Sequence, residues 1–467
     1  MTTASYNLQS TIYNLQSGKG RALPYTILMI APTSFFADYG GHIRILEEAR
    51  TLQKLGHRLT LATYHNGDDM PGLDIRRSWD VPWIKRALVG SSRHKLYLDV
   101  ALSYRVLETA LRLRPTIIHA HMHEGALMGA ALKHLLGVPL IFDFQGSLTS
   151  EMIDHHFLRA DGRLHHSLRQ LERLINLQAD ALLTSTSNTA SLLQRDFNFP
   201  AERLHIVNDR VDTDRYRPFD GSPDWDAERQ RLRAELGIPE GRRVVVYLGL
   251  LASYQGVNVL MEAARRLLPQ IPDLHFLIMG YPDVISYRRL AESLDVADHV
   301  SLPGRILYKD THAYLSLGDV AVAPKMSATE GSGKIPLYMA MGLPTVTFES
   351  PVSREYLGDA GIYAAFGSAD DLAAKIRLAL DQRTWAASLG ALGRDRAVRE
   401  LSWEHAARQI EAIYAEALER RQRVRRPTTD LRAGYIVPPR PTTDEAAPLA
   451  IPRRPGEERD EVIERGA

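Results

Sequence analysis

Two adjacent glycines near the start of the sequence stand where a phosphate could bind. Gly40 and Gly41 close a loop that follows the apolar run Ile27–Ala31, and an amphipathic stretch begins directly after them. Glycine lets the backbone approach a ligand closely, and free N–H groups at a helix start favour an anion. A tight strand-to-helix turn without a ligand would look the same, and the GxGxxG dinucleotide fingerprint is absent. The loop is therefore a candidate phosphate site.

A second glycine loop lies far downstream, after the apolar run Val320–Ala323. The loop and its neighbours that could do chemistry are Lys325, Glu330, Gly331, Ser332, Gly333 and Lys334. Backbone donors beside two glycines and nearby ammonium groups suit a diphosphate, whereas a carboxylate can accept sugar hydroxyls. The alternative is a solvated Gly-Ser loop with incidental charges.

The elements that must position these loops alternate between short apolar runs and amphipathic stretches of helical length. Strands are expected at Ile27–Ala31, Leu59–Thr63, Ile117–Ala120, Leu140–Phe144, Ala181–Thr184, Leu204–Val207, Val244–Gly249, Phe276–Met279, Val320–Ala323 and Thr345–Phe348. Helices are expected near 42–55, 96–113, 125–136, 163–178, 187–196, 257–268, 286–294, 334–341, 369–381 and 384–398. This alternation predicts an α/β protein with two doubly wound domains, which bind ligands at the carboxyl ends of their strands. Periplasmic binding proteins and several dehydrogenases share that outline.

Composition narrows the class of protein. The 467 residues include 57 basic and 56 acidic side chains, so there is no global charge that would favour nucleic acid. There is no cysteine, which excludes disulfides, thiolate metal sites and a cysteine nucleophile. The apolar runs are too short to span a bilayer. We expect a cytoplasmic protein, with possible peripheral contact to the inner face of the membrane.

A set of motifs, in order along the chain, resembles family 4 retaining glycosyltransferases. The motifs are Tyr39–His42, Leu55–Leu59, Asp209–Pro218, Tyr247–Gly249, Gln255–Val257, Glu330–Lys334 and Tyr338–Pro344. The likeness covers roughly residues 25 to 420. It implies the GT-B architecture, in which two Rossmann-like domains face a central cleft.

The resemblance assigns roles to the segments of the chain. We expect a flexible tail over 1–22, an acceptor-side domain over 23–210, a linker over 211–241, a donor domain over 242–400, a helix over 401–422 that packs back toward the N-terminal domain, and a disordered tail over 423–467. Donor contacts are expected from Gly40, Gly41, Arg210, Gly249, Gln255, Lys325, Gly331, Ser332, Gly333, Lys334 and Tyr338.

Three positions depart from the family pattern. The family usually has a ribose-binding glutamate where this chain has Leu337, and a diphosphate-binding Arg and Lys where it has Leu250 and Gln255. Each lost charge-assisted contact is worth about 1.5–3 kcal/mol. Lys334, Lys325 and Arg210 are the candidates to replace that charge.

On the acceptor side, His119, His121 and His123 alternate along one strand, which places all three on one face if the segment is extended. Such a run can ligate zinc. The resemblance instead implies no metal and no other cofactor, with His121 and His123 lining the cleft. The remaining acceptor-side candidates are Asp143 and Gln145, and Glu330 joins them as a candidate catalytic residue.

The segment 79–95 mixes tryptophans with cations and could rest on an anionic membrane surface or pack its aromatic rings inward. The expected function is transfer of a sugar from a nucleotide-sugar to a glycan, lipid-linked or small-molecule acceptor, with retention of configuration. An inactive GT-B protein that serves as a scaffold or partner subunit is the alternative, since three donor-side residues are replaced.

Overall fold

The computed structural model describes residues 24–38, 40–81, 95–154, 158–159, 162–327 and 331–425. Several predictions lie outside these residues: the tail over 1–22, most of the segment 79–95, Glu330, and nearly all of the tail over 423–467.

The N-terminal half is built on a parallel sheet. Seven strands of the described chain lie in the order β3 (Asp74–Arg77), β2 (Arg58–Thr63), β1 (Thr26–Ala31), β4 (Ile117–His121), β5 (Leu140–Phe144), β6 (Ala181–Thr184) and β7 (Leu204–Ile206). Its helices are α2 (Gly40–Lys54), α3 (Lys95–Leu113), α4 (Met122–Leu136), α5 (Leu148–Asp154), α6 (Arg163–Gln178) and α7 (Ser187–Phe197). The central strands are buried on both faces, which explains their unbroken apolar runs.

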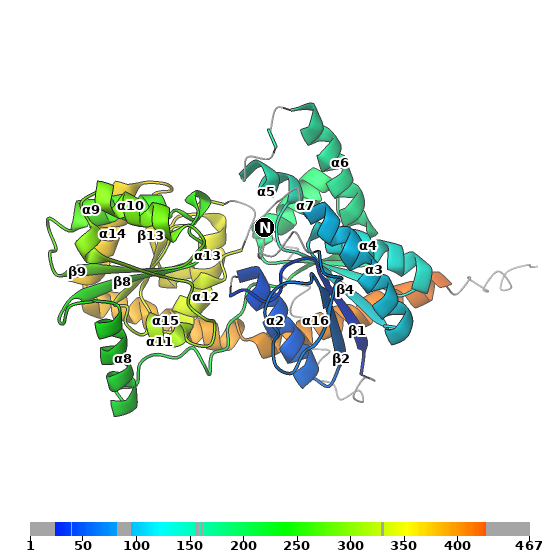
Figure 1. Cartoon of the computed structure of the whole chain (residues 1–467), viewed down its shortest axis with the longest axis horizontal. Coiled ribbons are helices and arrows are strands. Elements are labelled where there is room, and N and C mark those ends of the chain that lie inside the picture. Colours follow the sequence, from blue (N-terminus) through cyan, green and yellow to red (C-terminus); the bar gives the residue numbers. More distant parts are fainter. Residues whose placement is uncertain are drawn as a thin grey trace, which may run out of the picture. The chain divides into compact units, whose positions relative to one another are not determined.

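Helices cover both faces of this sheet (Figure 1). One buried cluster joins it to α2 and to α16 (Trp403–Arg425), and a second joins the opposite face to α3, α4, α6 and α7. Helix α16 is anchored by hydrogen bonds from Gln409 to the carbonyl of Ile206 and from Arg420 to that of Glu202.

The C-terminal half repeats the plan. Six strands of the described chain lie in the order β10 (Val300–Gly304), β9 (Leu274–Met279), β8 (Arg243–Leu248), β11 (Val320–Ala323), β12 (Thr345–Phe348) and β13 (Gly361–Ala364), all parallel. Its helices are α8 (Pro223–Glu235), α9 (Val257–Leu267), α10 (Val284–Ser293), α11 (Thr311–Leu315), α12 (Lys334–Ala340), α13 (Pro351–Leu357), α14 (Ala369–Asp381) and α15 (Arg383–Glu400). Two doubly wound sheets confirm the predicted fold class.

The strands that the sequence did not predict are all at sheet edges. These are β3, β10 and β13, and each is half exposed, so none carries a continuous apolar run. The segment 211–241, predicted as a linker, contains helix α8, with Pro223 at a first-turn position.

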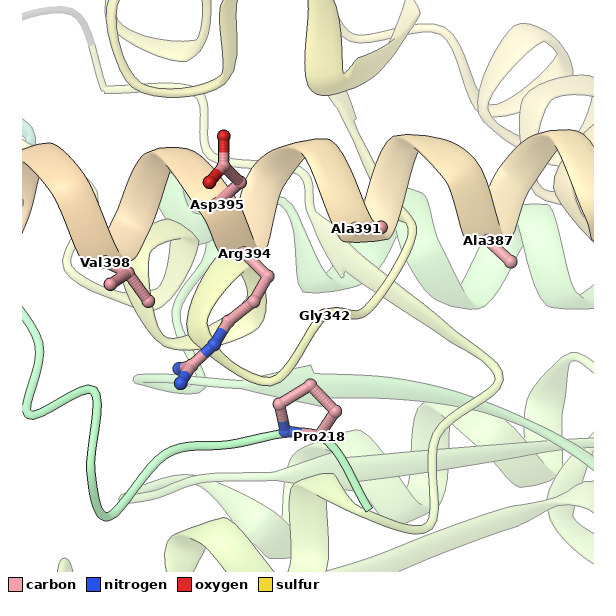
Figure 2. A pocket seen from close by; sticks show the side chains of 7 residues that line it. All are labelled: Pro218, Gly342, Ala387, Ala391, Arg394, Asp395 and Val398. Carbon is pink, nitrogen blue, oxygen red and sulfur yellow. The ribbon is translucent and has the colours of Figure 1, made fainter. Parts of the chain in front are cut away.

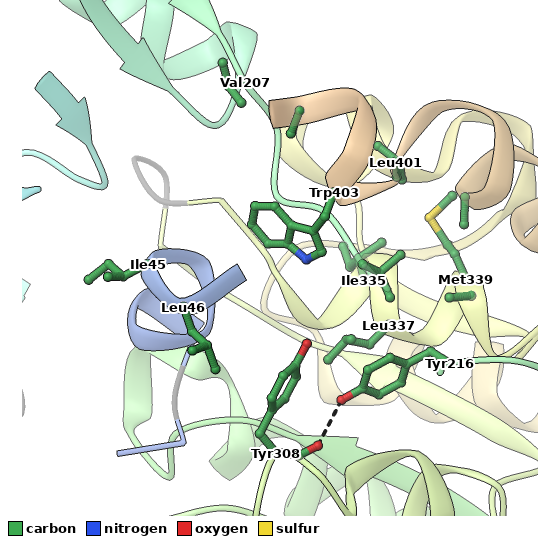
Figure 3. Packing of buried hydrophobic residues seen from close by; sticks show 14 of the residues in the cluster. Ile45, Leu46, Val207, Tyr216, Tyr308, Ile335, Leu337, Met339, Leu401 and Trp403 are labelled. Atoms are coloured by element: carbon green, nitrogen blue, oxygen red, sulfur yellow. Dashed lines mark hydrogen bonds between the residues drawn. The ribbon is translucent and has the colours of Figure 1, made fainter. Parts of the chain in front are cut away.

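Buried side chains from both halves pack together near the carboxyl ends of the strands. Leu46 of α2, Tyr308, Leu337 of α12 and Trp403 of α16 belong to one cluster (Figure 3). The hydroxyl of Tyr216 donates to the carbonyl of Tyr308 at 3.3 Å. This packing forms an apolar floor beside the two glycine loops.

Candidate donor and acceptor site

Both glycine loops open into one cavity of about 320 Å³. The predicted site residues among its lining are Gly40, Gly41, His123, Gln145, Arg210, Gly249, Gln255, Lys325, Gly331, Ser332, Gly333 and Lys334. They come from the loops and helix starts at the carboxyl ends of strands of both sheets, where α/β proteins bind ligands. Backbone amides and cations therefore converge on one pocket, as a diphosphate requires.

A cavity of about 440 Å³ beside α15 contains none of these residues (Figure 2). Arg394 of α15 lines this cavity and donates to the carbonyls of Thr213, Tyr216 and Ala340. These hydrogen bonds hold the segment before α8 against α15 and α12. The lining of the cavity is otherwise mostly alanine, proline and glycine. We assign the substrates to the pocket between the glycine loops.

The second glycine loop is held by contacts to both halves. The ammonium of Lys325 donates to the carbonyl of Gly331 at 2.6 Å. A Cβ atom at Gly331 would lie 2.5 Å from Asp209 Oδ2 and 2.9 Å from Ser185 Oγ, so only glycine fits there. The loop is thus pressed against the N-terminal half with its backbone facing the pocket.

Lys334 projects across the end of β8. Its Nζ donates to Gln255 Oε1 at 2.7 Å and lies 4.6 Å from the centre of the Tyr247 ring. A Cβ atom at Gly249 would meet Lys334 Nζ at 2.9 Å. The ammonium therefore lies beside Gly249 and Gln255, where the family pattern places its Arg and Lys.

Arg44 of α2 contacts three carboxylates and one backbone carbonyl beside the pocket. Its guanidinium forms a two-pronged ion pair with Asp143, at 2.8 and 3.0 Å, and donates to the carbonyl of Val207 and to Asp209. Glu48 lies 3.1 Å from Arg44 Nε. Burial acts to lower the pKa of Arg44, but the carboxylates of Asp143 and Glu48 raise it by more. The pKa therefore lies well above its usual value. The sequence analysis missed this residue.

Comparison with known proteins identifies the family. A model described as a glycosyl transferase 4-like domain matches residues 40–209, and a model described as glycosyl transferases group 1 matches residues 228–396. The chain belongs to the group 1 glycosyltransferases. This confirms the resemblance.

Curated relatives of this glycosyltransferase include a D-inositol 3-phosphate glycosyltransferase of Corynebacterium aurimucosum, 28% identical over 324 residues, which are 65% of this chain and 72% of the relative. The sulfoquinovosyl transferase SQD2 of Arabidopsis thaliana is 22% identical over 82% of this chain and 72% of its own length. The alpha-D-kanosaminyltransferase of Streptomyces kanamyceticus is 25% identical over 65% and 72%. All three are named as transferases, which gives no support to the scaffold alternative.

Solved structures share the fold. Sucrose-phosphate synthase from Thermosynechococcus elongatus has a TM-score of 0.71 and 18% identity, covering 85% of this chain and 100% of that chain. HepE of Anabaena, solved in complex with UDP and glucose, has a TM-score of 0.67 and 15% identity over 85% and 99%.

Three predicted site residues of the glycosyltransferase do not line the pocket. His121 and Asp143 are fully buried beneath it, where His121 Nδ1 lies 3.0 Å from Asp143 Oδ2. Tyr338 is also fully buried, and its hydroxyl accepts the amide N–H of Leu248 at 2.8 Å. The expectation that His121 lines the cleft is not met, because alternation along a strand cannot distinguish the cleft from the core, and direct substrate contacts of Asp143 and Tyr338 stay predictions. They are positioned to support lining residues.

Gln145 lines the pocket and also contacts the buried residues His121 and Asp143 beneath it. Its amide donates to Asp143 Oδ2 at 3.2 Å. Burial would raise the pKa of Asp143, but Arg44 and His121 hold it far below its usual value. The carboxylate therefore stays ionised and fixes Arg44 and Gln145 at once.

Among the described residues, four buried polar atoms of the pocket lining have no hydrogen-bond partner. They are Ser332 Oγ, His123 Nε2, Arg210 Nε and Trp403 Nε1. Buried polar groups in proteins are nearly always paired. Burial lowers the pKa of His123, so its ring is neutral and can donate or accept a hydrogen bond. Of the four, His123 Nε2 lies 3.5 Å from the buried carboxyl of Glu172.

Arg210, the third candidate cation, is committed elsewhere. Its guanidinium donates to the carbonyl of Glu400 and lies 3.4 Å from Gln409 Oε1. Burial lowers its pKa to about 10, which still leaves it charged at neutral pH. It holds α15 and α16 to the pocket wall through its two terminal guanidinium nitrogens.

The two halves also meet at the first glycine loop. Asp38 accepts from Arg305 Nε at 2.8 Å and from the amide of Tyr308 at 2.7 Å. The hydroxyl of Tyr281 donates to the carbonyl of Ala37 at 2.6 Å. These contacts join the two halves along the wall of the pocket.

We expect His42 to make stability sensitive to acid. His42 Nδ1 accepts the amide of Ala37 at 2.8 Å and its Nε2 lies 2.6 Å from Thr33 Oγ1, so the neutral ring ties down the loop before Gly40. Burial lowers its pKa to about 3. Between pH 6.5 and 3 the unfolded chain binds a proton that the folded chain does not, so stability is full above pH 6.5 and falls by about 1.4 kcal/mol per pH unit below it.

Urea unfolding at pH 7 and pH 5 checks this expectation. His42→Gln should be less stable at pH 7 but lose less stability on acidification, whereas His166→Gln, at an exposed position of α6, should match the parent protein. If the free energy of unfolding of His42→Gln depends on pH as steeply as that of the parent protein, His42 is not the source of the acid sensitivity.

Proposed function

We propose that this glycosyltransferase transfers a hexosyl-type group from a nucleotide-sugar to a hydroxyl of a glycan, lipid-linked or small-molecule acceptor, with retention of anomeric configuration. The observation that carries the proposal is the single pocket in which both glycine loops meet Lys334 and Lys325. Several relatives are named for glycosyl transfer to inositol 3-phosphate, which supports an acceptor hydroxyl.

The chemistry consists mainly of stabilising the leaving nucleoside diphosphate. As the bond to the anomeric carbon breaks, negative charge grows on the diphosphate, and backbone amides of the glycine loops and the Lys334 ammonium are fixed in place to receive it. The acceptor oxygen attacks on the face that the leaving group departs from, and its proton passes to that leaving group. No side chain needs to form a covalent intermediate with the sugar.

We also propose that protein cations, and not a metal ion, neutralise the donor diphosphate. Lys325 and Lys334 line the pocket, whereas its Arg44 and Arg305 are already paired with carboxylates. Adding Mg²⁺ or Mn²⁺ should leave kcat and the donor KM unchanged. A strict requirement for either ion in turnover would overturn this part of the proposal.

A donor screen tests the function. The protein is incubated with UDP-, GDP-, ADP- and dTDP-sugars in the presence of an acceptor panel that includes inositol phosphates, free sugars and aminocyclitols, and products are detected by mass spectrometry. We expect one donor to be consumed and a glycosylated acceptor to form. If calorimetry detects no binding of any nucleotide or nucleotide-sugar, the proposal fails.

The stereochemistry is a separate outcome of the same reaction. NMR of the purified product gives the anomeric configuration directly. A product with the configuration of the donor supports retention, and the opposite configuration overturns retention without overturning transfer.

We further propose that the N-terminal half makes peripheral contact with a membrane surface through Trp79 and the outward face of α3. Among the described residues, no helix is both long and apolar enough to cross a bilayer. The outward face of α3 carries six exposed apolar side chains beside the exposed polar residues Ser103 and Arg112. The exposed fractions are 39–68% at Leu96, Tyr97, Val100, Tyr104, Leu107 and Leu111. The ring of Trp79 packs against that of Tyr104 at a tilt of 42°, with ring centres 4.3 Å apart. Surface helices usually present polar groups to water, and aromatic and aliphatic side chains on one face suit a bilayer interface.

Vesicle flotation checks this contact. The parent protein should float with anionic phospholipid vesicles, and the double substitution Val100→Gln, Tyr104→Gln should lower the partition coefficient by roughly 30-fold, since each lost side chain removes about 1 kcal/mol of apolar transfer energy. Leu392→Gln, at an exposed position of α15, is the matched control. Equal flotation of all three proteins, or none, would contradict the proposal.

A further inference from the structure

Beneath the pocket, three side chains that the transfer chemistry does not use converge in the core. Glu48 comes from α2, and His119 and His121 come from β4. All three are fully buried, and one ligating atom from each lies within 4.8 Å of the other two. The two imidazole rings stack with centres 4.8 Å apart.

The outer nitrogen of each imidazole has a partner, and the inner nitrogen has none. His121 Nδ1 lies 3.0 Å from Asp143 Oδ2, and His119 Nδ1 lies 2.6 Å from the hydroxyl of Tyr414. Among the described residues, His119 Nε2, His121 Nε2 and both carboxylate oxygens of Glu48 have no hydrogen-bond partner, although Glu48 Oε1 lies 3.1 Å from Arg44 Nε. Because ionised Asp143 can only accept, the proton of its contact with His121 belongs to Nδ1.

Several carboxyl groups surround the single cation of this cluster. Glu48 and Asp143 bring two carboxylates, and Arg44 brings one cation. Asp209, which is only partly exposed, adds a further carboxylate at 3.2 Å from Arg44. Burial raises the pKa of Glu48 to about 8, so this carboxyl holds a proton at neutral pH unless a cation binds beside it.

We propose that Glu48, His119 and His121 form a structural binding site for one divalent metal ion of the zinc type, with His119 Nε2, His121 Nε2 and a Glu48 oxygen as ligands. Two imidazoles and a carboxylate are a frequent ligand set for zinc. Metal-binding histidines characteristically hold their other nitrogen on a carboxylate or another hydrogen-bonding group, as Asp143 and Tyr414 do here. His119 Nε2 already lies 3.7 Å from Glu48 Oε2, close to the separation of two ligands on one ion.

Such an ion would join the helix that begins with the first glycine loop to the centre of the sheet. Glu48 lies one helical turn beyond Arg44 on α2, and that helix starts at Gly40. Tyr414 brings α16 into the same network. The ion would therefore link α2 and α16 to β4, at a site separate from that of the donor diphosphate. This proposal departs from the expectation that the chain binds no metal.

Metal content tests the inference on the full chain. The protein is purified without added metal and with any affinity tag removed, and zinc is measured by mass spectrometry. It is also unfolded in guanidinium with a chelator and refolded with Co²⁺ or with no metal. We expect one ion per chain, the visible absorption of tetrahedral Co²⁺ after refolding, and a higher Tm with metal than without. Absence of bound metal in both preparations, with an unchanged Tm, would show that a proton alone balances the cluster.

Variants locate the site. Glu48→Gln and His119→Gln should lose stoichiometric metal, whereas His123→Gln should keep it. His123 follows the same strand, but its ring lies among Phe142, Phe144 and Glu172, outside the cluster. Retention of metal by the first two variants would place the ion elsewhere and overturn the assignment. If these variants fail to fold, the Co²⁺ spectrum of the parent protein still decides whether an imidazole site exists.

Discussion

Replacing Arg44 with methionine is expected to destabilise the protein by roughly 3–5 kcal/mol, because it leaves buried carboxylates without their cation. The guanidinium side chain is only 6% exposed and lies between Glu48, Asp143 and Asp209. Methionine replaces the first part of the arginine side chain with an unbranched apolar one but provides no charge and no donors. Turnover should also fall below detection, since Arg44 fixes Asp143 and lines the pocket.

Urea unfolding of Arg44→Met and of two comparison variants measures this effect. Arg44→Lys keeps the charge but cannot form the two-pronged pair, so an intermediate loss is expected. Arg50→Met removes a cation of the same helix that is more exposed and pairs only at 3.5 Å with Glu47, and should cost less than about 1 kcal/mol. If Arg44→Met lowers the free energy of unfolding by no more than Arg50→Met does, Arg44 does not stabilise the buried carboxylates as proposed.

The importance of Arg44 could not be predicted from the sequence because its partners are remote. Asp143 lies 99 residues away and Asp209 lies 165 residues away. A charged residue in the first turns of an amphipathic helix normally faces water, so nothing local indicates burial. Only the parallel sheet, which brings the ends of β4, β5 and β7 next to α2, assembles the cluster.

The fold itself was largely predictable because central strands of parallel sheets are apolar throughout. The run Val244–Gly249 and the observed strand Arg243–Leu248 nearly coincide. Edge strands gave no such pattern. For helix α13, a signal was present and overlooked: Ser350 caps the helix through the amide of Ser353, and Pro351 occupies its first turn.

The histidine run shows where periodicity stops being informative. Alternation correctly paired His119 with His121 on one face of β4, and their rings stack. His123 lies beyond the strand, in the first turn of α4, and reaches the pocket instead. The sequence predicts which side chains share a face of the strand. It does not predict whether that face lies against the core or the cleft, because this depends on how the helices pack on the sheet.

Lys334→Ala is expected to lower kcat/KM for the nucleotide-sugar by roughly 100-fold, the usual effect of removing one fixed donor of positive charge to a developing anion. Its ammonium lies beside Gly249 and 2.7 Å from Gln255 Oε1, in the place of the family's Arg and Lys. Steady-state kinetics with the identified donor measure the effect. Lys309→Ala, at an exposed position outside the pocket lining, is the control and should leave both constants unchanged.

A rescue experiment separates lost charge from lost structure. Gln255→Lys in the Lys334→Ala background returns an ammonium to the same place from the short 3₁₀ helix η2 (Ser253–Gln255) instead of from α12. If Lys334 supplies the charge that Leu250 and Gln255 no longer provide, the double variant should recover at least about tenfold in kcat/KM, or about 1.4 kcal/mol of transition-state stabilisation. If Lys334→Ala has parental kinetics, or if its defect persists in a folded double variant that still binds donor, Lys334 does not replace the missing cations.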